Sequence, residues 1–276
     1  MRAVGIIAAK EVRDGMRNKW VVATTLLLAA LALTLAFLGS APIGDVKVSP
    51  LDITVVSLSS LTIFLLPLIA LLLSYDAIVG EVDRGTMALL LSYPVSRWQI
   101  VFGKFIGHVL ILAIATVLGY GLAGLAIQLI LGNPDTSSWM AFMAMIGSSV
   151  LLGATFISIG YLVSTCVRDR NTAGGIAVGV WLLFVLIYDM ALLGVLVADH
   201  GRLLTAERVN WLLLFNPADA FRLFNLTGTA NVSLFAGMAG LSDDMATGRT
   251  TLLLVLVAWI VAPLALTTVL FSRKPV

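Results

Sequence analysis

The sequence predicts an all-α, polytopic membrane protein with six transmembrane helices, an N-terminal amphipathic helix and a short helical elbow on one side of the membrane. Composition is the first observation behind this prediction. Of 276 residues, 60% are hydrophobic and 12% are charged, with a mean hydropathy of +1.05, which leaves too little polar surface for a soluble domain. The second observation is six apolar runs of about 20 residues or more, the length that crosses a bilayer. We expect one transmembrane domain over residues 1–276.

Residues 1–19 predict an amphipathic helix that lies at the membrane surface and leads into the first span. Wound as a helix, this segment separates small and apolar residues from charged and polar ones: Gly5, Ala8, Val12, Met16 and the following Trp20 against Lys10, Glu11, Asp14, Arg17 and Asn18. The charges are scattered and no small-residue cleavage site follows, so a cleavable signal is not indicated. A charged N-terminal tail is the alternative.

The apolar runs predict six spans, and turn or charge signals separate them. The runs cover about 20–39, 53–74, 100–131, 139–165, 174–198 and 251–271. The third run is longer than one bilayer requires. Because Arg97 and Lys104 stand at its start, we expect that end to project from the membrane.

The distribution of Lys and Arg predicts that both termini are cytoplasmic, since short cytoplasmic loops carry the excess of these residues. The segments on the N-terminal side of the membrane hold Arg2, Lys10, Arg13, Arg17, Lys19, Arg84, Arg97, Lys104, Arg168, Arg170, Arg273 and Lys274. The two short loops on the other side hold only Lys47. The elbow at 75–99 is therefore predicted to be cytoplasmic and the segment 199–250 extracytoplasmic.

Segment 75–99 predicts a compact elbow of two short helices. Gly85 suits the left-handed position that ends a helix, Thr86 can cap the next one, and Pro94 closes it, after which Ser96 can cap the third span. Charged and apolar side chains then stand together on a stub too short to cross the membrane. Such a stub must bury its apolar side, against the membrane interface or against a cytoplasmic protein; the clustered charges favour a protein.

Segment 199–250 keeps apolar patches that are too short and too polar to span, "RVNWLLLFNPADAFRLFNL" and "VSLFAGMAGL". They predict short amphipathic helices at the outer surface. Asn216-Pro217 marks a helix start, with Asp219 in the first turn. A docking platform for an external partner and a surface loop that caps the bundle both fit this segment.

No motif for catalysis or for nucleotide binding is found. The only Gly-Lys pair, Gly103-Lys104, lies at the mouth of a span and not in a phosphate-binding loop. With a single cysteine and two distant histidines, a metal cluster is not predicted. Thioether ligation of Cu(I) by Met140 and Met143 is the one metal hypothesis, and the apolar lining that methionine ordinarily provides is its alternative. We therefore expect this chain to bind no cofactor and to have no catalytic site.

The segment from Glu81 to Lys104, "E-x-x-x-G-T-M-x-x-L-L-S-Y-P-V-S-R-x-x-I-x-x-G-K", resembles the signature between the second and third spans of six-span ABC exporter permeases (type V-like). The N-terminal "AAKEVRDGMRNKW" is similar to that family's connecting helix. The resemblance implies a homodimer in the bacterial inner membrane, with ATP and Mg bound by a separate ATPase subunit. It also implies that the elbow is the coupling helix that contacts this ATPase, through Glu81, Asp83, Arg84, Gly85, Thr86, Met87, Pro94 and Arg97.

Within that family, "KEVRDGMRNKW", the segment 75–104 and "FNPADAFRLFNL" resemble the permeases of NosDFY-type transporters. That resemblance implies a role in copper-site maturation of nitrous oxide reductase, with a NosF-like ATPase and a periplasmic, β-helical NosD-like protein as partners, and no nucleic acid. It assigns the periplasmic contact to Trp211, Phe215, Asn216, Pro217, Phe221 and Arg222. The alternatives are an exporter of a small hydrophobic compound or lipid, an ion-coupled secondary transporter that uses Asp189, and a structural anchor for a periplasmic protein.

Overall fold

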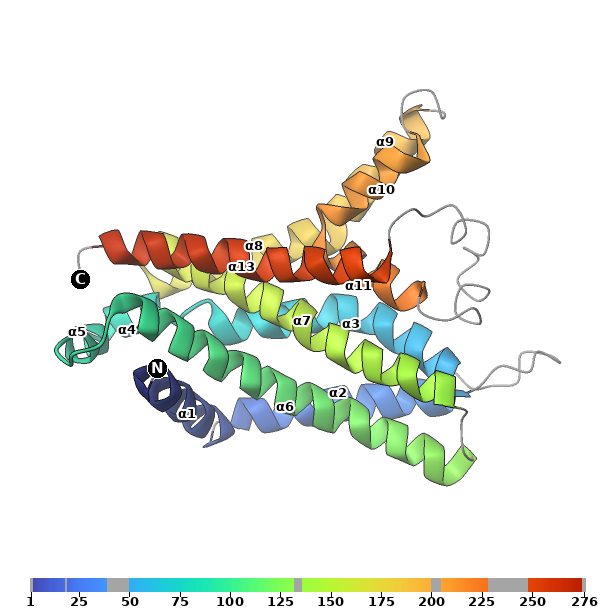
Figure 1. Cartoon of the computed structure of the whole chain (residues 1–276), viewed down its shortest axis with the longest axis horizontal. Helices are drawn as coiled ribbons and strands as arrows, with labels where there is room; N and C mark the ends of the chain where they lie inside the picture. Colours follow the sequence, from blue (N-terminus) through green and yellow to red (C-terminus); the bar gives the residue numbers. More distant parts are fainter. Residues whose placement is uncertain are drawn as a thin grey trace.

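The computed structural model describes residues 2–17, 19–38, 50–131, 136–199, 205–227 and 248–274, and in these ranges the regular structure is helical (Figure 1). The longer helices are α1 (Arg2–Arg17), α2 (Lys19–Leu38), α3 (Pro50–Ser74), α6 (Arg97–Leu131), α7 (Thr136–Cys166), α8 (Arg170–Leu182), α9 (Tyr188–Asp199) and α13 (Arg249–Arg273). The shorter ones are α4 (Val79–Asp83), α5 (Thr86–Leu91), the π-helical turn η1 (Leu183–Ile187), α10 (Ala206–Leu214) and α11 (Pro217–Leu226). The second predicted outer patch, at 232–241, lies outside the described residues.

Five of the six predicted spans are confirmed: in the part of the chain that the structure describes, five helices are long and apolar enough to cross a membrane. The predicted first span corresponds to α2, which reaches this length only together with α1, as a pair bent by 69°. The fifth span is continuous from α8 through η1 to α9. The third, α6, has 35 residues, about 50 Å of helix. This exceeds the hydrocarbon core of roughly 30 Å, and the excess places the start of α6 beside the elbow (Figure 1).

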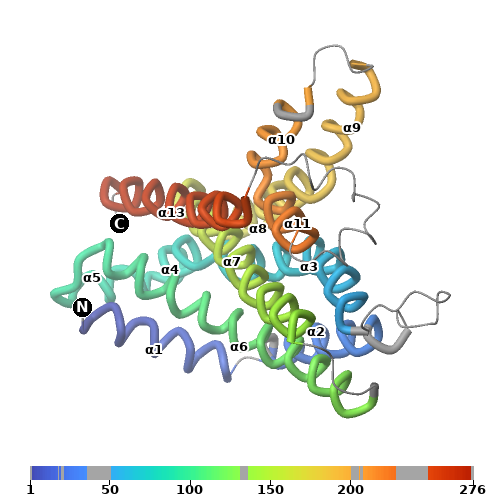
Figure 2. Tube along the Cα trace, turned by 45° about the vertical axis from the view of Figure 1, so that its right-hand side comes forward, coloured from blue at the N-terminus to red at the C-terminus, as the bar shows by residue number. Residues whose placement is uncertain are grey.

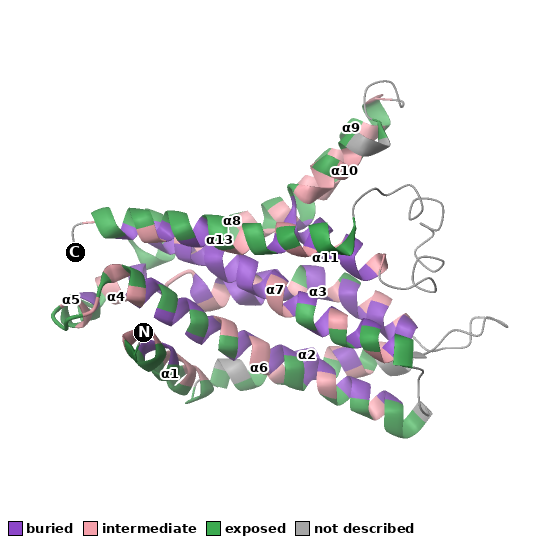
Figure 3. Ribbon diagram, viewed as in Figure 1, coloured by how far each residue is buried: buried purple, intermediate pink, exposed green. Residues whose placement is uncertain are grey.

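Helix α7 forms the centre of the bundle, where α3, α6 and α13 pack against it (Figure 2). Most side chains along this helix are buried (Figure 3), and Phe142, Phe156 and Tyr161 are among them. A side chain at Gly153 or Gly160 would collide with Leu112 or Ser74. Such close helix contacts are what small residues provide in membrane bundles, where dispersion replaces the hydrophobic effect.

The fifth span stands apart from this bundle. Only 6% of its most apolar window is buried, against 61% for α7, and none of the side chains in α9 is buried. In Figure 1 α9 rises away from the bundle together with α10. Its apolar surface is therefore available to lipid or to another protein chain.

Helix α1 is present as predicted, with Ala8 buried and Lys10, Asp14 and Arg17 exposed, as the two predicted faces require. The predicted place of Glu11 is wrong: it was expected on the polar side, but its side chain is 12% exposed and lies beside the buried Ile7 and Ala8. The reason is the neighbouring α6, which offers a close approach and a buried cation to the face that carries Glu11.

Candidate coupling site and outer platform

The elbow between α3 and α6 is built as the sequence suggests, with one difference in its capping. Gly85 has a positive φ of 70° and separates α4 from α5, a conformation that costs glycine nothing. Gly85 itself is the N-cap of α5, and the Thr86 hydroxyl donates back to the Glu81 carbonyl (3.2 Å). The predicted cap at Ser96 is also modified: Gln99 Oε1 accepts the Ser96 N–H (3.0 Å) at the start of α6.

The elbow presents a mixed surface to the outside. Leu89 and Tyr93 are 67% and 66% exposed. Asp83, Arg84, Gly85, Thr86 and Pro94, all predicted ATPase contacts, are exposed beside them. Met87, another predicted contact, is fully buried beneath this surface. The exposed part is an apolar tip with a charged rim, which is the composition that protein contacts favour.

Glu81 was predicted to lie on the exposed surface of the elbow and to contact the ATPase, but its carboxylate points into the protein. Its Oε1 lies 2.7 Å from Lys104 Nζ, and the same ammonium lies 2.8 Å from Glu11 Oε1. The Lys104 side chain is 4% exposed and each carboxylate 12%. One buried cation thus joins the elbow (Glu81), the N-terminal helix (Glu11) and α6. We call these three residues the Lys104 clamp.

The N-terminal helix reaches the clamp because two glycines of α6 let it approach. A Cβ at Gly107 would lie 2.5 Å from Glu11 Cβ, and one at Gly103 would lie 2.8 Å from Ile7 Cβ. Burial raises the pKa of Glu11, but the Lys104 ammonium outweighs this, and the pKa stays below its ordinary value. Glu11 therefore remains the charged partner of Lys104.

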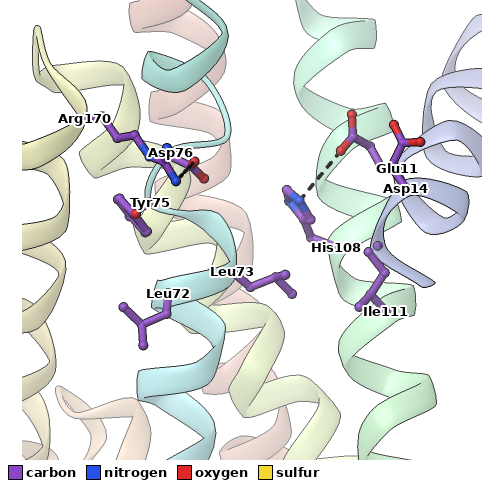
Figure 4. Close-up of a pocket in the computed structure, with 10 residues that line it drawn as sticks. Glu11, Asp14, Leu72, Leu73, Tyr75, Asp76, His108, Ile111 and Arg170 are labelled. Carbon is purple, nitrogen blue, oxygen red and sulfur yellow. Dashed lines mark ion pairs between the residues drawn. The ribbon is translucent and has the colours of Figure 1, made fainter. Parts of the chain in front are cut away.

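The clamp extends to α7 and borders a cavity of about 460 Å³ (Figure 4). His108 Nε2 lies 3.8 Å from Glu11 Oε2, and His108 Nδ1 shares a hydrogen bond of 2.7 Å with the Tyr161 hydroxyl. On the opposite wall Arg170 Nη2 pairs with Asp76 Oδ2 at 3.1 Å. Glu11, Asp14, Gly15, Leu72, Leu73, Tyr75, Asp76, His108, Ile111 and Arg170 line the cavity.

Hydrogen bonds to backbone groups tie the elbow and the nearby helix ends together. The Ser164 hydroxyl of α7 accepts the N–H groups of Ile78 and Val79, both at 3.0 Å. Arg97, predicted to contact the ATPase, instead donates to the carbonyls of Phe271 and Lys274 at the end of α13. These bonds satisfy groups that helix ends leave unpaired. The elbow is therefore anchored to α6, α7 and α1 at once.

The outer platform consists of α10 and α11, and the six predicted partner contacts differ there in their exposure. Trp211 and Phe215 are 61% and 64% exposed. Asn216, Pro217 and Phe221 are buried. Arg222 forms ion pairs with Asp189 of α9 (2.9 Å) and Asp219 (3.0 Å). Trp211 and Phe215 are thus the most exposed of the six, and the Arg222 side chain, 37% exposed, lies at the surface with its charge paired.

No additional metal-binding side chain is found, within the described residues, for the copper site proposed at Met140 and Met143. Met140 and Met143 are 64% and 51% exposed at the outer end of α7, and Met145 is buried. Within the described ranges no group of three His, Cys, Asp or Glu side chains could hold a metal ion.

Glu11, His108 and Tyr161 were not among the predicted site residues, and Lys104 was predicted only to lie at the mouth of the third span. The signal that could have found them is a cation and a histidine one turn apart at the mouth of a span, where ionisable groups persist for a reason. Asp189 was named only as the residue that an ion-coupled transporter would use; in the structure it pairs with Arg222.

The chain is similar to known transport proteins over its whole length. The model of the "ABC-2 family transporter protein" family matches residues 6–276. A protein of Pseudomonas aeruginosa described as "Probable ABC transporter permease protein NosY" is 44% identical over 277 residues, covering 100% of both chains. One of Stutzerimonas stutzeri with the same description is 45% identical over 275 residues, covering 99% of each.

Proposed function

The chain belongs to the ABC-2 family of transporter proteins, and we propose that it couples ATP hydrolysis in the cytoplasm to a periplasmic step in copper-site assembly of nitrous oxide reductase. As an ABC permease it works with an ABC ATPase. We assign the ATPase to a NosF-like subunit, the periplasmic partner to a NosD-like β-helical protein, and the membrane to the bacterial inner membrane with both termini cytoplasmic.

The Lys104 clamp is the observation that carries this proposal. The elbow exposes Leu89, Tyr93 and Arg84 to a partner, while Glu81 at its base is held inside by Lys104. A push on the tip therefore reaches α1 and α6 through a buried ion pair, and α7 through Ser164. Closure of two ATPase subunits would move such an anchored elbow together with the helices behind it, as interface-driven rearrangements require.

The fifth span supports the dimer in this proposal. Its apolar surface is exposed, and side chains added at Gly175 or Gly179 would meet open space. A second copy of the chain packing there would bury this surface and give two elbows for two ATPase subunits. Open glycines permit the close helix approach seen in membrane dimers.

Co-purification tests the ATPase contact. With a tagged permease, L89D and R84E are each expected to lower the amount of co-purifying ATPase about tenfold, the effect of losing an interface residue worth about 1.4 kcal/mol. R273E, an exposed arginine at the inner end of α13, is the matched control and should leave recovery unchanged. Undiminished recovery and ATP turnover in L89D and R84E would refute the assignment of the elbow.

The periplasmic half needs its own experiment. W211A and F215A should reduce recovery of the periplasmic β-helical protein and leave the ATPase bound. An ATPase-inactive complex should then fail to support copper-site assembly, measured as copper content of nitrous oxide reductase. Normal copper content with the inactive ATPase would make the permease a structural anchor.

A further inference from the structure

The fifth span contains a π-helical turn directly beneath the outer platform. Residues Leu183–Ile187 form η1, and the Tyr188 N–H donates to the Leu183 carbonyl, five residues back. Where such a turn returns to α-helical pairing, one carbonyl is left without a helix donor. Because η1 ends at Ile187 and α9 begins at Tyr188, the pattern skips the next carbonyl along the chain, that of Phe184. Single π-helical turns of this kind recur at functional sites.

A side chain of the outer platform satisfies that carbonyl. Asn216 Nδ2 donates to the Phe184 carbonyl at 2.9 Å, while Asn216 Oδ1 accepts the Ala218 N–H and caps α11. Asn216 is fully buried. An unpaired buried carbonyl costs roughly 1–3 kcal/mol, so this one bond favours the π-helical form as long as α11 stays in place.

The bond from Asn216 begins a polar chain that returns to the same span. Asn216 Nδ2 also contacts Asp219 Oδ2 (2.9 Å), Asp219 Oδ1 contacts Arg222 Nη1 (3.0 Å), and Arg222 Nη2 contacts Asp189 Oδ2 (2.9 Å). The chain therefore leaves the fifth span at residue 184 and rejoins it at residue 189, on the two sides of the π-helical turn.

Bonds on the two sides of the turn go to different parts of the molecule. Below the turn, Trp181 Nε1 donates to the Phe64 carbonyl of α3. Above it, no side chain of α9 is buried. The Tyr188 hydroxyl, at the base of α9, donates to the Leu212 carbonyl of α10. The base of α9 is thus bonded to the platform through Tyr188 and Asp189, while α8 is bonded to the bundle.

We propose that Asn216 and Arg222 are positioning residues that hold the fifth span in its π-helical register, so that docking of α10–α11 and rotation of α9 are one two-state element. If the platform moves away, the Phe184 carbonyl loses its donor and the span returns to regular α-helix. The extra residue of the turn then adds one α-helical step to the span, which turns α9 by about 100° and shifts it by about 1.5 Å. Tyr188 and Asp189 then leave the platform, so each change favours the other.

This inference deepens the proposed function and rests on it for its purpose: a periplasmic protein bound to Trp211 and Phe215 would set, or respond to, the register of α9. Coupling between two sites requires such an element that both can bias. The register itself is a property of the permease alone, and it can be measured without ATPase or periplasmic partner.

The experiment uses the full-length permease in lipid nanodiscs with its only cysteine, Cys166, replaced by serine. Spin labels placed singly at positions 172–182 and 188–198 report lipid and water accessibility along both halves of the span. The unaltered chain should show a helical phase break of about 100° between the halves. In N216L, which lacks the donor to Phe184, the break should disappear, and the distance between labels at 193 and 211 should change.

Two further variants keep the outcome decisive. R222Q removes the return of the chain to Asp189 and should also abolish the phase break. Deletion of Leu186 removes the extra residue, so the span can become regular α-helix while α9 keeps its present orientation; the phase break should disappear, but the distance between labels 193 and 211 should stay as in the unaltered chain. N225L is the matched control, because Asn225 is a buried amide of α11 that bonds Ser148 of α7; it should keep the break. A phase break retained in both N216L and R222Q would overturn the inference, whatever the ATPase experiments show.

Discussion

The Glu81 carboxylate lies 2.7 Å from the Lys104 ammonium, inside the protein, although the exposed tip of its own elbow is a few residues away. Lys104 also holds Glu11, so two carboxylates from different segments share one cation. A buried ion pair of this kind adds little net stability over apolar packing, but breaking it leaves a buried charge. Its value here is geometric, because it makes the elbow and the N-terminal helix move as one part.

Replacement of Lys104 by methionine should destabilise the protein and uncouple it. Two buried carboxylates lose their partner, at a cost of about 3–5 kcal/mol, which should lower the midpoint of unfolding in detergent. ATP turnover should no longer respond to the permease. K10M, an exposed lysine that also pairs with Glu11, is the control and should change the midpoint little. Equal midpoints for the two variants would show that the clamp is not formed.

Replacement of Gly107 by alanine should push α1 away from α6. The new Cβ would lie 2.5 Å from Glu11 Cβ and 3.1 Å from the Ala8 carbonyl, and one of the helices must shift. G121A places a methyl group in open space on the same helix and should be neutral or stabilise by up to about 1 kcal/mol. Distances between labels on α1 and α6 measure the shift; unchanged distances in G107A would contradict the close crossing.

Replacement of Ser164 by alanine should loosen the base of the elbow. The hydroxyl accepts two buried N–H groups, from Ile78 and Val79, and each unpaired group costs about 1–3 kcal/mol. Hydrogen exchange at these two amides should accelerate. S60A removes a hydroxyl that bonds only within its own helix and is exposed, so exchange at residues 78 and 79 should be unaffected there.

Docking of the outer platform should weaken as the pH rises from 3.8 to about 7. Burial, then the Asp189 carboxylate, raise the pKa of Asp219 from 3.8 to about 7, against the Arg222 guanidinium. A raised carboxyl pKa stabilises the docked state fully below the ordinary pKa of 3.8, and this contribution is lost as the pH rises through about 7. The charged or titratable groups facing Asp219 are Asp189, Arg222 and, more distantly, Tyr188.

The distance between labels at 193 and 211 measures this dependence, because it reports the platform against α9. The unaltered permease should shift toward the undocked distance as the pH rises from 3.8 to about 7, the two pKa values of Asp219, and should change little above that. D219N carries no titrating group and should show one distance throughout that range. A pH-dependent distance in D219N would assign the effect to another group.

Local sequence features were enough to predict the long apolar helices, the elbow between the second and third of them, and the helix that begins at Asn216-Pro217. These features depend on hydrophobic run length, on Gly85 and on a proline, each of which acts within a few residues of its own position. Periodicity also predicted α1, yet it placed Glu11 on the wrong face, because it assumes that a charged side chain faces water.

The partners of the buried charged and polar groups depend on how the helices pack, because they come from other helices. Glu81 and Glu11 turn inward because α6 brings Lys104 between them, and Asn216 is buried because η1 leaves the Phe184 carbonyl without a helix donor. Burial of a charge or amide is favourable only where a neighbouring helix completes its bonds. That neighbour lies 23 to 93 residues away in these cases, from Glu81 to Lys104 and from Glu11 to Lys104, and no local pattern records it.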